Sequence, residues 1–273
     1  MKSFRSRLIR HLLYTAVAIL MAWLITEIIR ISLHHDSFFT GWLLLACVSL
    51  LTLFNARKKI PVLNLLRANT WLQWHIYVGL FSIAVFIMHI HYRIPNGSLD
   101  LVLATLFILV AGSGLIGIWL SRRLPPRLSR RGEQVIFERI PALRMRLRDE
   151  VEQLMILGVG ESGTATLADL YKDLLFPYLS GPRNFWFHIF ESNRPYHRLR
   201  EKIRLAHRYM NDQEKNVMAQ ISHRVRIKED LDYQYAGQAL LKRWLFLHIP
   251  LTYGLLVFII LHLVVVYAFV GDI

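Results

Sequence analysis

WLQWHIYVGLFSIAVFIMHIHY at residues 71–92 and WLFLHIPLTYGLLVFIILHLVVVYAF at residues 244–269 are the two stretches that decide the fold. Each is an apolar run with two histidines fourteen residues apart: His75 and His89 in the first, His248 and His262 in the second. At 3.6 residues per turn, this spacing falls about 40° short of four turns and rises about 21 Å. We therefore predict two helices that each present both imidazoles on one face, near opposite sides of a hydrocarbon layer about 30 Å thick.

The composition is that of a membrane protein. Apolar residues make up 54% of the 273 residues, which is high for an ordinary soluble domain. Five runs are apolar enough to be spans, at residues 12–33, 38–54, 71–92, 99–120 and 244–270. We predict an all-α membrane protein whose five transmembrane helices form a haem-binding bundle. Helices 1–4 occupy residues 1–121, an all-helical domain occupies residues 122–242, and helix 5 occupies residues 243–273.

The net charge of +14 follows the positive-inside pattern. Basic residues gather before the first span, between the second and third spans, and after the fourth span, whereas the opposite loops contain few of them. This predicts an inner membrane of bacterial type, with the N-terminus and residues 122–242 cytoplasmic and the C-terminus outside. Because the bilayer accounts for the basic charge, we expect lipid as a partner and no nucleic acid.

The segment 122–242 shows helical patterns at about 133–156, 164–176, 196–210, 212–227 and 234–243, after a break at Pro125-Pro126. The letters G-x-G-x-x-G occur at residues 112–117, inside a span, and at residues 158–163. Neither follows a strand, so we interpret the first as a helix-packing surface and the second as a loop. The aromatic segment Phe185–Phe190 is interpreted as a core segment or as one lying in the membrane interface.

The four span histidines carry the predicted chemistry. The charge pattern makes the two helices parallel, so His75 should face His248 and His89 should face His262. Imidazole in hydrocarbon is costly without a partner, and each pair offers two axial nitrogens to a six-coordinate haem iron. The single cysteine, Cys47, excludes covalent haem attachment and cysteine-held iron–sulfur clusters on this chain. We predict two non-covalent b-type haems, with small residues that allow a close approach at Gly79 and Gly114.

Further polar residues lie near the predicted span ends. His91 is about 160° around the helix from His75, so we expect it, like Arg93, at a haem propionate or the aqueous interface. Propionate candidates on the other side are Arg67, Lys242 and Arg243. Glu27 and Arg30 have the i, i+3 spacing of an ion pair. This pair is either an interfacial salt bridge or a proton-handling carboxylate beside a quinol pocket.

Histidine pairs at H-x13-H on two helices, with glycines on neighbouring helices, resemble the membrane dihaem b-type cytochromes. These include the cytochrome b of quinol–cytochrome c reductases and the ferric-reductase-like transmembrane proteins. The resemblance covers residues 71–92 and 244–269, and it implies two b haems that exchange electrons with quinol, a redox subunit or a cytoplasmic flavin. The Pro-Glu-Trp-Tyr quinol motif is absent, and only residues 270–273 follow the last span, where ferric reductases carry a flavin domain.

The resulting hypothesis is transmembrane electron transfer through two bis-histidine haems. The chain would link the quinone pool or a redox partner protein on one face to an acceptor on the other, as the electron-conducting subunit of an oxidoreductase, and we assign it no catalytic residue. One alternative is a metal or haem transporter that uses the same histidines as transient ligands. The other is a non-redox membrane scaffold.

Overall fold

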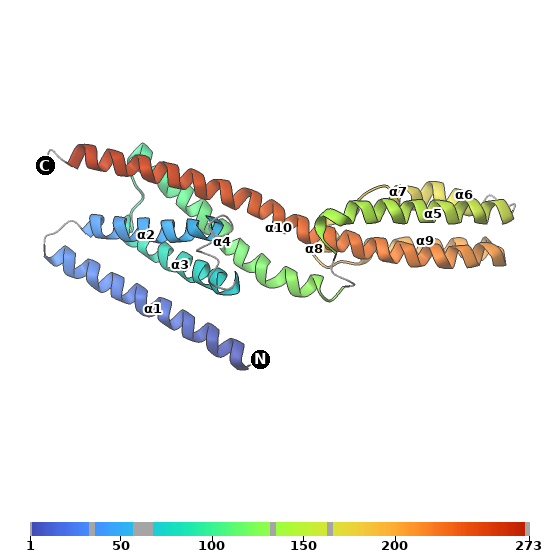
Figure 1. The fold of residues 1–273 in the computed structure, drawn as a ribbon, viewed down its shortest axis with the longest axis horizontal. Helices are drawn as coiled ribbons and strands as arrows, with labels where there is room; N and C mark the ends of the chain where they lie inside the picture. Colours follow the sequence, from blue (N-terminus) through green and yellow to red (C-terminus); the bar gives the residue numbers. More distant parts are fainter. Residues whose placement is uncertain (1, 33–35, 57–67, 132–134, 163–165, 271–273) are drawn as a thin grey trace. The chain divides into compact units, whose positions relative to one another are not determined.

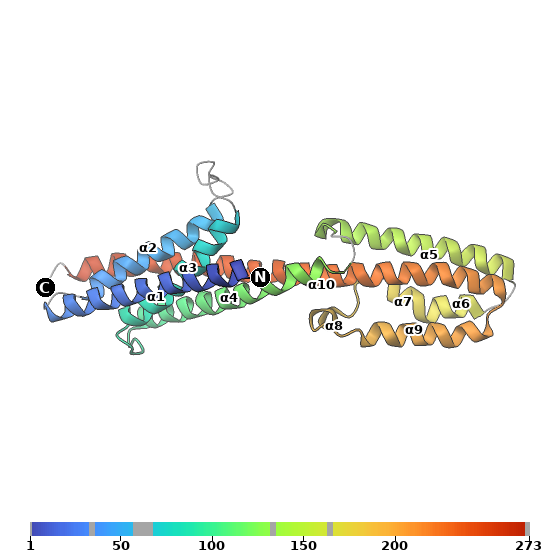
Figure 2. The same cartoon turned by 90° about the horizontal axis from the view of Figure 1, so that it is seen from below.

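The structure is a computed structural model that describes residues 2–32, 36–56, 68–131, 135–162 and 166–270. These residues form helices and no strand. Five of the helices are long and apolar enough to cross a membrane: α1 (Lys2–Ile31), α2 (Asp36–Ala56), α3 (Ala68–His89), α4 (Ser98–Leu128) and α10 (Asp212–Val270) (Figures 1 and 2). The prediction of an all-α membrane protein with five spanning helices is confirmed.

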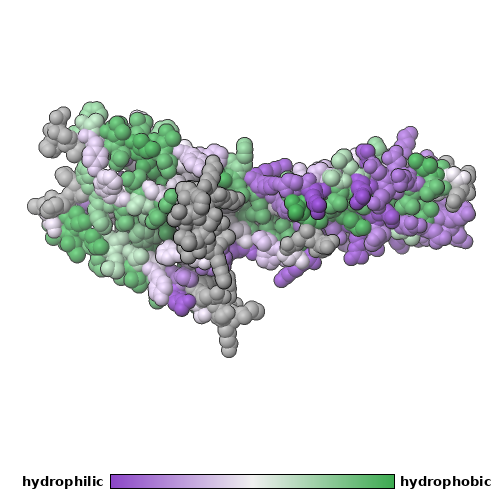
Figure 3. Space-filling view, in the orientation of Figure 1, coloured by the Kyte–Doolittle hydropathy of each residue, from purple (hydrophilic) through white to green (hydrophobic). Residues whose placement is uncertain are grey.

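The chain divides into two compact units. We call Met1–Trp119 with Leu245–Ile273 the membrane unit, and Leu120–Trp244 the helical insertion. The domain boundaries predicted at 121/122 and 242/243 lie within two residues of these limits. In the space-filling view, the surface of the membrane unit is mostly hydrophobic and that of the insertion is mostly hydrophilic (Figure 3).

In the membrane unit, α2 and α3 pack along each other, and α1 packs on α3 (Figures 1 and 2). A buried apolar cluster joins α2, α3, α4 and α10 and consists of Val48, Phe86, Ala104, Phe107 and Leu255. Large apolar side chains such as Ile108 and Val257 are exposed on the outer faces. Lipid tails are as apolar as these side chains, so in a bilayer this exposure has little cost.

Two helices are longer than the sequence predicted. α4 continues through Pro125 and Pro126 to Leu128, although we expected the prolines to end it. Proline keeps a helical φ angle, and the Pro125 carbonyl still accepts the Ser129 N–H at 3.1 Å. α10 is continuous, although we expected separate helices at 212–227 and 234–243 before the last span. The stretch between them stays helical because its charged side chains are paired inside the insertion.

The insertion begins with the end of α4 and ends with the first half of α10. Between these lie α5 (Ile140–Ser162), α6 (Thr166–Leu170), α7 (Phe176–Leu179), α8 (Phe185–Ile189) and α9 (Arg194–Ala206). Short turns join them: 3₁₀ turns at Phe137–Arg139 and His207–Tyr209 and a π-helical turn at Tyr171–Leu175. The apolar core of this unit includes Val151, Leu167, Leu175, Ile221 and Val225.

The second glycine motif is helical where the structure describes it. Gly158 and Gly160 lie within α5, so the predicted loop is wrong at these positions, and Gly163 lies outside the described residues. A Cβ atom at Gly158 would lie 2.9 Å from Leu167 Cδ2. The absence of a side chain at Gly158 therefore allows α5 and α6 to pack closely.

A buried polar cluster lies inside the insertion and consists of Arg144, Tyr178, His188, Lys228, Glu229 and Asp232. The Lys228 ammonium donates to Asp232 at 2.5 Å, and the Arg144 guanidinium lies 3.5 Å from the same carboxylate. The Tyr178 hydroxyl donates to Glu229 at 2.7 Å. Burial raises the pKa values of Glu229 and Asp232 and lowers that of Lys228. The cluster thus places charged groups in a low-dielectric interior, where each depends on its partners.

His188 makes the stability of the insertion depend on pH. Burial lowers its pKa, and neither ring nitrogen makes a hydrogen bond of standard geometry to a described residue. Below about pH 6.5 the unfolded chain protonates this imidazole more readily than the folded chain does, so stability falls as the pH falls. We expect His188→Leu to reduce that slope by up to about 1.4 kcal/mol per pH unit.

Hydrogen exchange of amides in residues 140–230, corrected for intrinsic rates and followed from pH 7.5 to 5.5, measures this slope in the full-length protein. The raised pKa of Glu229 acts in the opposite direction, but both proteins contain that residue. The exposed His197 provides a matched control, because His197→Leu should keep the wild-type slope. Equal slopes in wild type and His188→Leu would contradict the prediction.

Candidate functional site

The four predicted histidines lie on α3 and α10 of the membrane unit. His75 and His248 face each other, with ring centroids 6.4 Å apart and ring planes at 78°. His89 and His262 line one cavity near the C-terminal end of α3. The helices thus bring together one histidine from each apolar run at two levels of the bundle.

The separation of His75 and His248 suits two ligands of a single metal ion. A nitrogen ligand lies about 2 Å from its metal and about 1 Å from the centre of its own ring, so opposed ligands have ring centres about 6 Å apart. The observed 6.4 Å agrees with this value. In addition, His75 Nδ1 is buried and makes no hydrogen bond of standard geometry to a described residue. Buried polar nitrogens normally have a partner, and the backbone of Leu51 is the protein group that approaches this ring.

Ser113 on α4 contacts Nδ1 of His248. Ser113 Oγ lies 2.7 Å from His248 Nδ1 and donates its own proton to the Val110 carbonyl at 2.8 Å. With the single hydroxyl proton on the Val110 carbonyl, the Nδ1–H of His248 is the donor in the first contact. The neutral ring then carries its lone pair on Nε2, which is the atom that a metal would bind.

Thr40 on α2 acts on His89 in the same way. Thr40 Oγ1 lies 3.1 Å from His89 Nδ1 and donates to the Asp36 carbonyl at 3.0 Å. On α4, Asp100 Oδ1 lies 3.2 Å from His262 Nδ1, and a carboxylate can only accept at this contact. Three of the four histidines therefore have Nδ1 within hydrogen-bond distance of an oxygen of a neighbouring helix, and in the tautomer that donates there the lone pair lies on Nε2.

A glycine follows each of the two hydroxyl residues, and it also contacts the same histidine. A Cβ atom at Gly41 would lie 3.1 Å from His89 Cε1, and one at Gly114 would lie 3.8 Å from His248 Cε1. Thr40-Gly41 and Ser113-Gly114 are thus two copies of one arrangement, a hydroxyl against Nδ1 and a glycine against Cε1. We call each a hydroxyl–glycine cradle.

The cradles account for the predicted close approach at Gly114 but not for the one predicted at Gly79. Gly114 belongs to the cradle of His248, whereas a Cβ atom at Gly79 would meet only Leu51 Cδ2, at 4.0 Å, among the described residues. Sequence reasoning missed Thr40, Gly41 and Ser113. A hydroxyl residue followed by glycine in two different spans was the available signal, but its meaning depends on which helices are neighbours.

The cavity that contains His89 and His262 has a volume of about 870 Å³. Residues of α2, α3, α4 and α10 line it, mostly with apolar side chains, and the stacked rings of Phe86 and Phe107 form part of its wall. Its size falls in the range of cofactor pockets, about 300–1,000 Å³. Two imidazoles in an apolar cavity of this size are the donor set and the space that a bis-histidine haem requires.

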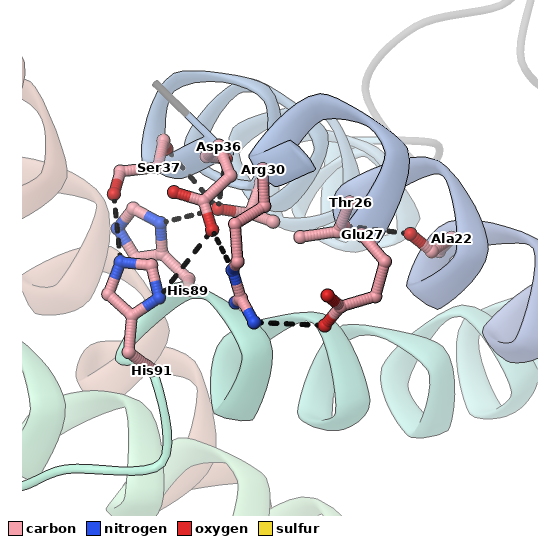
Figure 4. Close-up of polar contacts among 9 residues, drawn as sticks. Ala22, Thr26, Glu27, Arg30, Asp36, Ser37, His89 and His91 are labelled. Carbon is pink, nitrogen blue, oxygen red and sulfur yellow. Dashed lines mark hydrogen bonds and ion pairs between the residues drawn. The ribbon is translucent and has the colours of Figure 1, made fainter. Parts of the chain in front are cut away.

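A chain of polar contacts lies at the edge of this cavity (Figure 4). The Arg30 guanidinium contacts Glu27 at 2.9 Å, as predicted from their spacing, and Asp36 at 3.1 Å. His91 completes the chain, with Nδ1 3.7 Å from Asp36 and Nε2 3.0 Å from the Ser37 hydroxyl. His91 and the following Tyr92 both have positive φ, which is a costly conformation for residues other than glycine. The backbone is thus bent to turn His91 towards α2.

The proposed propionate ligands have different environments. Arg93 lines the cavity of His89 and His262. Lys242 instead forms an ion pair with Glu138, and Arg243 lies over the ring of Phe185, so both are engaged within the insertion. Arg67 lies outside the described residues.

Within the part of the chain that the structure describes, no group of three or more histidine, cysteine, aspartate or glutamate side chains is arranged to hold a metal ion. A haem needs only two protein ligands, because the macrocycle supplies the other four. Comparison with protein-family models, with curated proteins and with solved structures finds no match to this chain.

Proposed function

We propose that the protein is a dihaem b-type electron conduit of the membrane. The observation that supports this proposal is the opposition of His75 and His248, whose ring centroids are 6.4 Å apart, with Ser113 Oγ against Nδ1 of His248. His89 and His262 would hold the second haem in the 870 Å³ cavity. A b haem with two histidine ligands transfers single electrons at iron without opening a site for substrate.

The residues of the chain would perform three tasks at these sites. The four imidazoles bind iron, and the cradles orient His89 and His248 and select the tautomer that can bind. The apolar walls exclude water, and Arg93 supplies a cation for a propionate at the cavity edge. The two histidines of α3 are about 21 Å apart along the helix axis, so the two carriers would lie one above the other across the bilayer.

The orientation and partners follow from charge and from the polar edge of the cavity. We propose that the N-terminus and the insertion are cytoplasmic, because basic residues lie at the start of α1 and follow the apolar part of α4. The His89–His262 cavity would then lie near the outer face. A quinol that is oxidised there releases two electrons and two protons, and His91 with Asp36 provides proton-accepting groups beside it. A redox partner protein would complete the path.

The experiment that tests the proposal is a dithionite-reduced minus oxidised spectrum of the purified protein, together with its haem-to-protein ratio. We expect b-type bands and two haems per chain. A protein that is folded and contains no haem after expression with haem supplied would overturn the proposal, and it would favour the scaffold alternative. A transporter would be recognised by haem or metal that exchanges freely across liposomes containing the protein.

Gly41→Ala tests the cradle of His89. The added methyl group would lie 3.1 Å from His89 Cε1, so the imidazole must move away from its position against Thr40. Changes next to a metal ligand commonly weaken binding about 10–100-fold, and we expect a loss in this range at one of the two sites. Titration of haem-depleted protein with haem, followed by absorbance, measures the two affinities.

Gly112→Ala is the matched control for that titration. Gly112 lies in α4, and a Cβ atom there meets nothing within 4 Å among the described residues. This variant should keep both wild-type affinities. If Gly41→Ala also keeps both, the contact between Gly41 and His89 has no bearing on the site.

A further inference from the structure

Three large aromatic side chains are exposed on and beside the short helix α8 of the insertion. Trp186 is 62% exposed, Phe187 47% and Phe190 77%. His188, between them in sequence, is buried in the polar cluster. The reading of Phe185–Phe190 as a core segment is therefore wrong for these three residues. We call Trp186, Phe187 and Phe190 the aromatic patch.

Contacts within the insertion fix α8 to the parts of α4 and α10 that adjoin the spans. The Arg243 guanidinium lies 4.9 Å above the ring of Phe185, and Arg243 directly precedes Trp244, where the last apolar run begins. Arg127 forms a 3.0 Å ion pair with Glu191, one residue after the patch. Arg127 is seven residues beyond Leu120, the end of the apolar run of α4, or about 10 Å along the helix.

Arg243 directly precedes the last apolar run, so its contact brings Phe185 close to the level of the lipid headgroups. Glu191, by contrast, lies about 10 Å along α4 from the end of the other run, somewhat beyond that level. A bilayer about 40–45 Å thick with a hydrocarbon core of about 30 Å has headgroup layers of roughly 5–8 Å on each side. Tryptophan and phenylalanine are favoured at this boundary, where the ring is shielded from water by the upper parts of the acyl chains. Exposed aromatic side chains close to the start of a span would have an apolar phase to enter.

We propose that α8 is an interfacial membrane anchor, whose aromatic patch inserts among the headgroups of the bilayer that holds the spans. The adjoining end of α4 has five arginines in ten positions: Arg122, Arg123, Arg127, Arg130 and Arg131. Of these, Arg127 pairs with Glu191, and Arg131 contacts Asn193 and Tyr233. Basic clusters next to a span attract anionic lipids at about 1 kcal/mol per residue. Anionic phospholipid is therefore the partner that fits both the charge and the apolar surface.

The size of the patch favours lipid over a protein partner. An aromatic side chain buries about 150–250 Å² in full, so at exposed fractions of 62%, 47% and 77% the three can bury only about 280–465 Å² more. A specific protein interface usually buries about 600–1,000 Å² on each partner. Burial of the patch in a bilayer requires no such minimum area. The spans already hold the helical insertion at the membrane, so the patch does not have to bring it there.

The test measures the depth of position 190 in the full-length protein in nanodiscs. In a Cys47→Ser background, the cysteine of Phe190→Cys is labelled with an environment-sensitive fluorophore. Lipids that carry a nitroxide in the headgroup or high on the acyl chain then quench the fluorescence of this label. Ile156→Cys in α5 is the matched control, since Ile156 is apolar and 68% exposed but makes none of the contacts of α8. We expect at least threefold stronger quenching at position 190 than at position 156.

Each outcome of this experiment decides a part of the proposal. Equal, weak quenching at positions 190 and 156 would overturn the anchor, as would strong quenching that persists unchanged in Trp186→Ser/Phe187→Ser protein. Quenching at position 190 should be at least twofold stronger in nanodiscs with 30% anionic phospholipid than in zwitterionic ones, and equal values would exclude the anionic partner. None of these measurements depends on bound haem, so the anchor and the electron conduit are tested separately.

Discussion

On the proposed assignment of two haems per chain, His248→Ala is expected to lower the haem content of the purified protein to one. Removing this imidazole leaves His75 as the only protein ligand at its site, whereas His89 and His262 are unchanged and lie about 21 Å away along the helices. A haem iron that loses one of two strong axial ligands binds weakly and is lost during purification. The remaining haem should keep the bands and midpoint potential of one of the two wild-type transitions.

A potentiometric titration followed by absorbance measures both quantities at once. His11→Ala is the matched control, since His11 is an imidazole of the membrane unit that stacks on Tyr77, with ring centroids 5.2 Å apart, and belongs to neither pair. This control should retain two haems. His262→Ala should give the complementary result and keep the haem held by His75 and His248.

Ser113→Ala separates the role of the ligand from that of its positioning residue. It keeps Nε2 of His248 but removes the oxygen that accepts from Nδ1–H at 2.7 Å. We expect two haems and a shift in only one midpoint potential, because the ligand loses the hydrogen bond that increases its basicity. Two haems after His248→Ala, or loss of both from protein whose helical content by circular dichroism is unchanged, would contradict two independent pairs.

The spans and the histidine pairs were predictable because they depend on periodicity and hydropathy alone. The H-x13-H spacing places His75 with His89, and His248 with His262, on one face of each helix whatever surrounds it. The cradles were not predictable in this way. Ser113 and His248 are 135 residues apart, and Thr40 and His89 are 49 apart. Only the packing of α2 on α3 and of α4 on α10 shows which hydroxyl reaches which imidazole.

The continuity of α10 was missed for a related reason. Residues 228–233 are mostly charged or polar, and the helices predicted at 212–227 and 234–243 left them out. In the structure, Lys228 and Asp232 are buried and lie one turn apart on the same helix, while Arg144 approaches from α5. Charged residues in a sequence are normally predicted to be exposed. This prediction fails where oppositely charged side chains pair in the interior.

Asp232→Ala is expected to destabilise the insertion by about 3–5 kcal/mol, because it leaves buried charges without their partner. Lys228, whose side chain is fully buried, loses its carboxylate, and Arg144 loses the same group. The backbone N–H of Arg183, which donates to Asp232 at 3.1 Å, loses its acceptor as well. Asp232→Asn keeps an oxygen for that N–H but not the negative charge, so it should recover only a minor part of the loss.

Two comparisons show whether the effect comes from buried charge. Asp212 lies on the same helix and pairs with Lys215 at 3.0 Å, but its side chain is almost fully exposed, so Asp212→Ala should cause little change. Adding Lys228→Met to Asp232→Ala should restore part of the lost stability, because the double variant no longer buries an unpaired ammonium. Hydrogen exchange across residues 140–230 of the full-length protein measures all four variants. A double variant that is less stable than Asp232→Ala alone would show that Lys228 contributes through packing rather than through charge. The cluster would then not be stabilised as a buried ion-pair network.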